Sequence, residues 1–281
     1  MDEKGLGKRL QRARQKAGLT QQQLCQRANL SFSTLTKIER GAIKAPSIFT
    51  VQAIASALGS GLDELIGVHS PALHRNLSRT KSGVSFVYFD VNGCLVHFYQ
   101  RAFAKLAAAS GAPSDTVETA FWHYNDDVCR GTMSLSDFNT YLAERLGVMS
   151  VDWQQQYLDT VEPIVEMQEL LTWASERYKV GLLTNIMPGL LSAMLRLGRL
   201  PTLSYDAVVD SSEVGVIKPE PKMYEIAQAR AGCPPEEILL IDDSRTNLMA
   251  AEKLGWHVLW FDDARPEEAV ERVREVLEPA N

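Results

Sequence analysis

Residues 1–68 place apolar positions at helical spacing among polar and basic residues. The opening segment predicts an amphipathic helix whose apolar face is formed by Leu6, Leu10, Ala13 and Ala17. Gly18 is expected to end this helix. Thr20 is followed three residues later by Gln23, the spacing of a capping box, and this predicts a second helix that runs through Ala28.

A third helix is predicted from Phe32 to Arg40, with Ser31 as its N-cap and Gly41 at its end. Asn29 occupies the turn before it, where Asn tolerates a left-handed backbone. Two further helices are predicted near Ile48–Leu58 and Leu62–Ile66. Two short helices joined by a tight turn form a helix-turn-helix unit, whose second helix lies in the major groove. We therefore predict an all-α five-helix DNA-binding domain over residues 1–68, referred to below as the head.

Beyond a polar linker at residues 69–83, short apolar runs alternate with helix-length segments. The runs are Val84–Phe89, Tyr178–Leu183, Tyr205–Val209, Ile238–Ile241 and His257–Phe261. Strands separated by helices form parallel sheets with helices on both faces. We predict an α/β Rossmann-like, doubly wound parallel sheet over residues 84–281, whose ligands bind at the carboxyl ends of the strands.

Composition narrows the class of protein. A length of 281 residues and a hydrophobic fraction of 45% suit two globular domains. No apolar run approaches the roughly 18 residues of a membrane span, and the charged N-terminus leads into no signal sequence. We therefore expect a cytoplasmic protein without a membrane partner. A disulfide framework or a zinc site is disfavoured because no Cys-x-x-Cys pair is formed by Cys25, Cys94, Cys129 and Cys233.

The net charge of −6 is distributed unevenly along the chain. Lys and Arg occur 10 times in the segment 1–68 and Asp and Glu 5 times, which gives it a net charge of +5, and the rest of the chain carries −11. A solvated basic face is a common reason for such a count. A basic segment joined to an acidic one also indicates a nucleic-acid contact confined to one end of the chain.

Polar residues follow four of the predicted strands at the point where each strand ends. They are Asp90, Thr184, Asn185, Lys218, Asp242 and Asp243. Each type is also common in turns and helix caps, but together they suit phosphoryl chemistry. A carboxylate can attack phosphorus, magnesium binds carboxylate oxygens, and a hydroxyl and an ammonium can hold phosphoryl oxygens.

The helices of the head carry a characteristic order of residues, at Thr20–Leu24, Asn29–Ser31, Lys37–Gly41 and Pro46–Ser47. This order resembles the Cro/phage-repressor family, which implies that the partner is double-stranded operator DNA. The resemblance implies that DNA phosphates are contacted by Gln21, Arg40 and Lys44. It implies that base edges are contacted by Phe32, Ser33, Thr36 and Lys37.

Two alternatives remain open for the head. Phe32 could meet a thymine methyl group in the groove, or pack over the start of its helix. Some helix-turn-helix modules bind protein instead of DNA. For a DNA-binding head we expect a homodimer on a two-fold-related operator, with half-sites roughly 34 Å apart.

The order of the strand-end residues, with the stretch from Ile241 to His257, resembles the haloacid dehalogenase superfamily in its branch with a small helical cap. The cap would span about residues 97–165, with helices near Tyr99–Ser110, Asp115–Tyr124, Leu135–Leu146 and Asp152–Thr160. The resemblance implies that Asp90 is a catalytic nucleophile. It implies a phosphate-binding and catalytic role for Thr184 and Lys218, with Asn185 also at the phosphoryl group.

The resemblance also implies a Mg²⁺ cofactor. Asp90 would be one metal ligand, and Asn92 would contribute its backbone carbonyl. Asp243 would be the direct carboxylate ligand from the fourth strand, with Asp242 beside it or acting through water.

One position departs from the family pattern. Phosphatases of the family carry a second Asp two residues after the nucleophile, where it protonates the leaving oxygen and then activates water. Here that catalytic position is Asn92, and an amide cannot do acid–base work, which is typically worth about 10²–10⁴-fold in rate. Metal-free dehalogenases of the superfamily also lack this Asp, but the pair Asp242 and Asp243 argues against that alternative. A second alternative is deamidation, to which an Asn followed by Gly is prone. Deamidation of Asn92 would place an Asp at the catalytic position.

These patterns together predict a transcriptional regulator. Its head would bind operator DNA, and its phosphatase-like domain would sense a small phosphorylated metabolite with little or no turnover. The alternative is an active magnesium-dependent phosphatase whose head localises it or controls its own gene. From the sequence alone, we expect Asn92→Asp to restore phosphate release.

Overall fold

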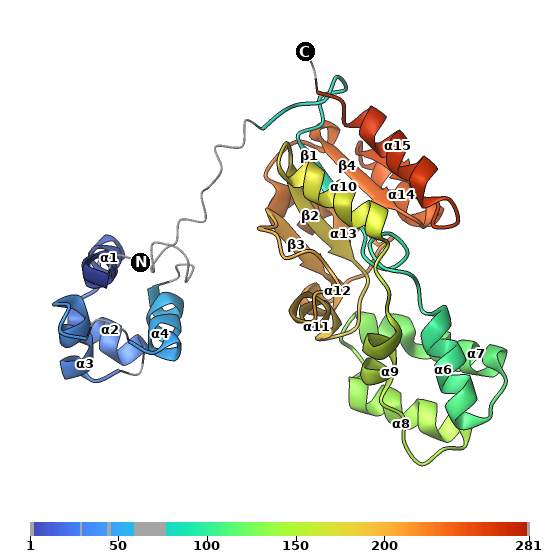
Figure 1. Cartoon of the computed structure of the whole chain (residues 1–281), viewed down its shortest axis with the longest axis horizontal. Helices are drawn as coiled ribbons and strands as arrows, with labels where there is room; N and C mark the ends of the chain where they lie inside the picture. The colour runs from blue at the N-terminus through green and yellow to red at the C-terminus, as the bar shows by residue number, and fades with distance from the viewer. Residues whose placement is uncertain (1–2, 29, 44–45, 59–76, 280–281) are drawn as a thin grey trace. The chain divides into compact units, whose positions relative to one another are not determined.

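The computed structural model describes residues 3–28, 30–43, 46–58 and 77–279. The chain divides into two units, Met1–His74 and Arg75–Asn281, and each has a hydrophobic core of its own. The first unit is helical and the second is built on a parallel sheet (Figure 1).

The described part of the head contains α1 (Glu3–Lys16), α2 (Gln21–Ala28), α3 (Phe32–Glu39) and α4 (Ile48–Leu58). Its core is formed by buried side chains from all four helices, among them Leu10, Leu24, Leu35, Ile38 and Ile54. The fifth helix predicted near Leu62–Ile66 lies outside the described residues, as do Asn29 and Lys44.

The predicted helix caps of the head are present. The backbone N–H of Thr20 donates to Oε1 of Gln23 at 2.8 Å, and the N–H of Gln23 donates to Oγ1 of Thr20 at 3.2 Å. Ser31 caps α3 by accepting a hydrogen bond from the N–H of Thr34 at 3.1 Å. These bonds satisfy N–H groups that the first turn of a helix leaves without partners, and they fix where α2 and α3 begin.

A buried ion pair joins α1 to α3. Arg14 donates to the Glu39 carboxylate through Nε at 2.7 Å and Nη2 at 3.1 Å. The side chains are only 10% and 3% exposed, respectively. Gly7 lies where α1 crosses α3, and a Cβ there would come within 2.4 Å of the Ile38 carbonyl oxygen. The two helices therefore pack at a distance that only glycine allows at this crossing.

The second unit is built on five parallel strands in the order β3-β2-β1-β4-β5. They are β1 (Phe86–Phe89), β2 (Lys179–Thr184), β3 (Ala207–Asp210), β4 (Ile238–Asp242) and β5 (His257–Trp260). Each predicted strand is present, and its ends lie close to the predicted ones. The order reverses beside β1, so the carboxyl ends of β1 and β4 meet at the switch point where such sheets bind ligands.

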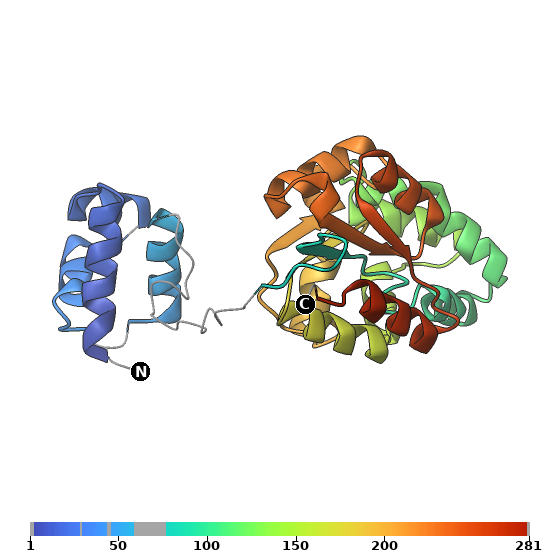
Figure 2. The same ribbon diagram turned by 90° about the horizontal axis from the view of Figure 1, so that it is seen from above.

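Helices cover both faces of the sheet. One face packs against α10 (Val165–Ser175) and α15 (Pro266–Val276), which lie together in Figure 1. The opposite face packs against α13 (Pro221–Ala231) and α14 (Arg245–Lys253), and Figure 2 shows helices on both sides of the strands. Shorter helices follow β2 and β3 at α11 (Leu190–Arg196) and α12 (Ser211–Val214), and the 3₁₀ turn Pro235–Glu237 precedes β4. The prediction of a doubly wound sheet is confirmed.

The segment between β1 and α10 forms the helical cap (Figure 1). It contains α6 (Gln100–Ser110), α7 (Ser114–Cys129), α8 (Leu135–Leu146) and α9 (Trp153–Thr160). All four predicted helices are present, but α7 continues past its predicted end because Asn125, Val128 and Cys129 extend its buried face. Aromatic rings fill the centre of the cap, with Tyr99 and Phe121 at 5.0 Å.

Two chain segments, joined by a single β-bridge, form a neck between the cap and the sheet. Val96 pairs with Pro163 in an antiparallel bridge, flanked by a hydrogen bond of 2.9 Å from the His97 N–H to the Glu162 carbonyl. The carbonyl of Val96 also accepts a hydrogen bond of 2.8 Å from the N–H of Gly93. The neck is thereby bonded directly to the loop that follows β1.

Among the described helices, none combines the length and apolar character needed to cross a bilayer.

Candidate functional site

The carboxyl ends of β1 and β4 bring a lysine between two aspartates. Nζ of Lys218 lies 2.8 Å from Oδ1 of Asp90 and 2.6 Å from Oδ2 of Asp242. Asp90 follows β1 and Asp242 ends β4, whereas Lys218 comes from the loop after α12. All three side chains are buried, so each charge depends on its neighbours for stabilisation.

The two adjacent aspartates of β4 have different surroundings. Both oxygens of Asp242 already accept hydrogen bonds, from Lys218, from the N–H of Ser244 at 2.8 Å and from Nδ2 of Asn247 at 3.0 Å. The Asp243 carboxylate instead lies over Gly93, where a Cβ would come within 2.3 Å of its Oδ2. The Asp242 carboxylate is thus occupied by hydrogen bonds within the protein and helps to orient Lys218, while the Asp243 carboxylate faces the loop after β1.

The acidic cluster suits a divalent cation. Carboxylate oxygens of Asp90, Asp242 and Asp243 lie within 4.8 Å of one another, and carboxylate oxygens are the ligands that Mg²⁺ prefers. Lys218 contacts two of these groups, so three carboxyl groups face one ammonium group. A divalent cation bound here would balance the two negative charges that remain when all three carboxyl groups are ionised.

Burial and mutual repulsion shift the titration of this cluster. Burial raises the pKa of Asp90 to about 8, although the nearby Lys218 opposes that shift. Burial, reinforced by the charge of Asp242, raises the pKa of Asp243 to about 6. Burial alone would lower the pKa of Lys218, but the two carboxylates outweigh it and raise that pKa. Positive charge at this site therefore favours the carboxylates in their ionised form.

Thr184 and Asn185 lie at the end of β2, beside β1. Asn185 and Lys218 are joined by a pair of hydrogen bonds, from the Lys218 N–H to Oδ1 at 2.7 Å and from Nδ2 to the Lys218 carbonyl at 2.8 Å. Thr184 is fully buried, and its hydroxyl has no hydrogen-bond partner among the described residues. A buried hydroxyl without a partner is uncommon, and it suits a site whose polar ligand completes the bonding.

Asn92 is held by two tyrosines of the cap. The Tyr157 hydroxyl donates to Oδ1 of Asn92 at 2.6 Å, and Nδ2 of Asn92 donates to the Tyr99 hydroxyl at 3.1 Å. Nδ2 also lies 3.4 Å from the Asn185 carbonyl oxygen. The sequence did not single out either tyrosine, because no local pattern distinguishes them from the other aromatic residues of the cap.

Other polar and aromatic residues of the cap do not contact the acidic cluster by any described interaction. Arg101 is paired with Glu162 on the surface, and the ring of His123 stacks on Tyr141 at 5.8 Å. Phe121 is part of the cap core.

In the head, the residues predicted to contact DNA share one side of α3. Phe32, Ser33 and Lys37 are exposed, and Thr36 lies one turn after Phe32 with its hydroxyl buried. Phe32 is 52% exposed, which favours a contact in the groove over packing at the helix start. Arg40 is exposed at the end of the same helix.

Gln21, another predicted DNA contact, is engaged within the head. Its Nε2 donates to Oε2 of Glu39 at 2.7 Å. The Glu39 carboxylate therefore accepts hydrogen bonds from both Arg14 and Gln21. Lys44 lies outside the described residues.

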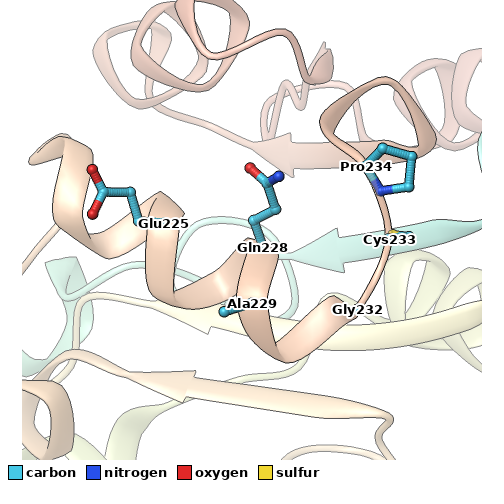
Figure 3. Close-up of a pocket in the computed structure, with 6 residues that line it drawn as sticks. All are labelled: Glu225, Gln228, Ala229, Gly232, Cys233 and Pro234. Carbon is cyan, nitrogen blue, oxygen red and sulfur yellow. The ribbon is translucent and has the colours of Figure 1, made fainter.

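A surface pocket of the sheet unit lies away from the acidic cluster (Figure 3). It is lined by Glu225, Gln228, Ala229, Gly232, Cys233 and Pro234, which come from α13 and the turn after it. This turn precedes β4, whereas Asp242 ends that strand. The pocket is therefore at the opposite end of β4 from the acidic cluster.

A family model described as haloacid dehalogenase-like hydrolase matches residues 85–255. The chain belongs to this family. A second model, described as helix-turn-helix, matches residues 10–65. The haloacid dehalogenase-like chain is therefore a fusion of a Cro/repressor-type helix-turn-helix region to a hydrolase-type domain.

Individual relatives match different lengths of the chain. An immunity repressor protein of Bacillus phage phi105 is 42% identical over 62 residues, which is 22% of this chain and 42% of the repressor. Acyl-CoA dehydrogenase family member 10 of Mus musculus is 26% identical over 231 residues, which is 78% of this chain and 21% of that protein. This haloacid dehalogenase-like chain spans less than half the length of either relative.

A solved structure shares the fold of the second unit. It is a HAD family enzyme from Bacteroides thetaiotaomicron in complex with magnesium and inorganic phosphate. The two are 21% identical with a TM-score of 0.55, over 64% of this chain and 96% of that chain. The second unit therefore shares its fold with this haloacid dehalogenase-like structure.

Proposed function

We propose that this protein is a transcriptional regulator whose phosphatase-like domain acts as a magnesium-dependent sensor. Residues 1–68 would bind operator DNA as a homodimer, and residues 84–281 would bind Mg²⁺ and the phosphoryl group of a small phosphorylated ligand. Residues 69–83 would link the two. Binding of the ligand would change DNA affinity by about 5–150-fold, the usual range for coupled sites.

The observation that carries this proposal is the environment of Asn92. The family's acid–base position holds an amide, and that amide is bonded to Tyr99 and Tyr157 of the cap. The remaining polar groups of the site suit a metal and a phosphoryl group: Asp90, Lys218 and Asp243, with the Thr184 hydroxyl, which has no hydrogen-bond partner in the described part of the chain. Such a site retains groups for binding while lacking the group that transfers protons.

Support for each half comes from the relatives. The matched phage protein is an immunity repressor, which favours operator binding by the head through Phe32, Ser33, Thr36, Lys37 and Arg40. The Bacteroides enzyme binds magnesium and inorganic phosphate, which favours the same pair of ligands here. Asp90 and Asp243 would be direct ligands of Mg²⁺, with the backbone carbonyl of Asn92.

The second candidate function is an active phosphatase controlled by its head. It is favoured by the contact of Lys218 with Asp90, because a nucleophilic carboxylate and its neutralising cation are both in place. In that case Asp90 would attack phosphorus and another group would protonate the leaving oxygen.

The decisive experiment uses the full-length protein in two parallel assays. Operator sites are first selected from a randomised duplex library, and DNA binding is then measured with and without magnesium and phosphorylated ligands. Phosphate release is measured on the same ligands. A ligand-dependent change in DNA affinity without release supports the sensor. Steady release by the native protein favours the phosphatase, and the absence of any salt-sensitive DNA binding contradicts the regulator.

A further inference from the structure

The carboxylate of Asp243 is held differently from the other two carboxylates of the cluster. Asp90 contacts the Lys218 ammonium and accepts a hydrogen bond from the N–H of Val91 at 2.7 Å, and Asp242 is bonded through both of its oxygens. In the described part of the chain, the hydrogen bond that another side chain donates to Asp243 reaches its main-chain oxygen and not its carboxylate. The direction of this carboxylate therefore depends on how its main chain is held.

Trp260 holds that main chain. Its indole Nε1–H donates to the carbonyl oxygen of Asp243 at 2.8 Å. Trp260 ends β5 in register with Asp242, the last residue of β4, and the N–H of Phe261 donates to the Asp242 carbonyl at 3.0 Å. The end of β5 therefore bonds two successive carbonyls of the β4 end. The second of these bonds comes from a side chain and extends the ladder to Asp243.

The indole ring is itself fixed in place. The guanidinium carbon of Arg245, an exposed residue at the start of α14, lies 4.5 Å from the centre of the Trp260 ring. This distance is typical of a cation–π contact. The ring is half-buried and packs against the core on this face of the sheet. These contacts limit rotation of the indole and keep Nε1 directed at Asp243.

The peptide that Trp260 holds controls a closely confined carboxylate. A Cβ on Gly93 would come within 2.3 Å of Oδ2 of Asp243, so this carboxylate lies directly against the loop after β1. Mg²⁺ requires near-octahedral geometry, with ligand oxygens about 2.0–2.1 Å from the metal. A small rotation of the Asp243 main chain would therefore remove its carboxylate from a position suited to the cation.

We infer that Trp260 is a positioning residue for the proposed magnesium site, since its indole N–H fixes the peptide of Asp243 and so preorganises the carboxylate. The inference rests on the proposed function, because it takes Asp243 as a ligand of Mg²⁺. Residues that orient a metal ligand typically contribute about 10–100-fold to metal affinity. Trp260 acts through the main chain of the ligand, so we expect the lower end of this range.

The test compares two tryptophan substitutions in the full-length protein by calorimetric titration with magnesium chloride. Trp260→Phe keeps an aromatic ring beside Arg245 and removes the N–H, so it should weaken magnesium binding about tenfold. Trp256→Phe is the matched control. Trp256 is buried just before β5, and its Nε1 has no hydrogen-bond partner among the described residues. The same substitution there removes no hydrogen bond and should leave magnesium affinity unchanged.

Tryptophan emission provides a second measurement, which a general loss of packing would not imitate. Trp260 is bonded to the peptide of the proposed metal ligand, so magnesium should change the emission of the native protein. At saturating magnesium, this change should persist in Trp256→Phe and largely disappear in Trp260→Phe. Thermal melting without metal verifies that both variants are folded.

Each contrary result has a distinct meaning. Equal magnesium affinity in the native protein and in Trp260→Phe would overturn the inference and leave the magnesium site in place. An equal loss in Trp256→Phe would also overturn it, because packing and not the hydrogen bond would then be responsible. An emission response that is unchanged in saturated Trp260→Phe would count against it in the same way. Absence of magnesium binding by the native protein would overturn both the inference and the sensor function proposed for this domain.

Discussion

The hydroxyl of Tyr157 donates a 2.6 Å hydrogen bond to Oδ1 of Asn92. Tyr157 belongs to α9 of the cap, and Asn92 belongs to the loop after β1. The position that a phosphatase would use for proton transfer therefore serves here as a polar connection between the cap and the sheet. The consequences of this bond can be measured.

Restoring the missing carboxyl group alone is not expected to restore an enzyme. In Asn92→Asp the hydroxyls of Tyr99 and Tyr157 would both be able to donate to the carboxylate, which stabilises its charged form and lowers its pKa. Less of this carboxyl group would then be protonated near neutral pH and available to protonate the leaving oxygen. We expect phosphate release from an aryl phosphate to stay close to the native level. Combining Asn92→Asp with Tyr157→Ala should raise release about 10²–10⁴-fold.

The control for this pair is the further change Asp90→Asn, which removes the nucleophile and should abolish the gained activity. Strong turnover by Asn92→Asp alone would show that the tyrosines do not restrain position 92.

Gly93 is expected to be essential for magnesium binding. Its backbone has a φ of +86°, and a Cβ would come within 2.3 Å of the Asp243 carboxylate. Gly93→Ala should displace this carboxylate and weaken magnesium binding at least about tenfold, which corresponds to about 1.4 kcal/mol. Magnesium affinity can be measured by calorimetry.

Gly147→Ala is the matched control, since Gly147 has a φ of +66° but no heavy atom within 4 Å of the added Cβ. It should cost stability through backbone strain while leaving magnesium affinity unchanged. Equal losses in the two variants would mean that strain, and not the carboxylate, is responsible.

The basic residues at the end of α3 should contribute to DNA binding in different ways. Arg40→Ala removes a predicted phosphate contact, so it should weaken binding to all sequences and reduce the salt slope by about 1. Lys37→Ala removes a predicted base contact, so it should mainly relax sequence preference at one operator position. Gel-shift titrations over a range of salt concentrations measure both effects.

Arg196→Ala serves as the charge-matched control, because Arg196 is exposed on α11 of the other unit. A salt slope that is the same in Arg40→Ala and in Arg196→Ala would contradict the predicted role of Arg40.

The buried ion pair of the head should be costly to break on one side. Arg14→Ala would leave Glu39 charged and buried, an effect of about 3–5 kcal/mol in other buried pairs. Hydrogen exchange at Leu24 and Leu35 should accelerate accordingly, with exposed Arg27→Ala as the control. Unchanged protection in Arg14→Ala would show that Gln21 alone can satisfy the carboxylate.

Much of the architecture was predictable because it depends on local signals. Each strand is a short, mostly apolar run, and α2 and α3 start at capping residues whose bonds are present. The strand-end residues converge because parallel strands end at one edge, so Asp90 and Asp242 are brought to the same lysine. The positions of the strands along the sequence were enough to predict that these strand-end residues converge.

The environment of Asn92 could not be predicted in the same way. Tyr99 precedes the first helix of the cap and Tyr157 belongs to the last, so the two meet only through the packing of the whole cap. From the sequence, the amide at position 92 was a missing group and Asn92→Asp its repair. The structure adds two partners for that amide, and they change the expected result of the repair.

The neck connects the cap directly to the loop that follows β1. Val96 pairs with Pro163 of the segment that returns from the cap, and the carbonyl of Val96 accepts a hydrogen bond from the N–H of Gly93. Any displacement of the cap at this neck is therefore expected to move the peptide between Asn92 and Gly93. We therefore expect a fluorescent probe on a cysteine introduced by Met149→Cys, at an exposed position of the cap, to respond to metal binding at the aspartates without contacting them.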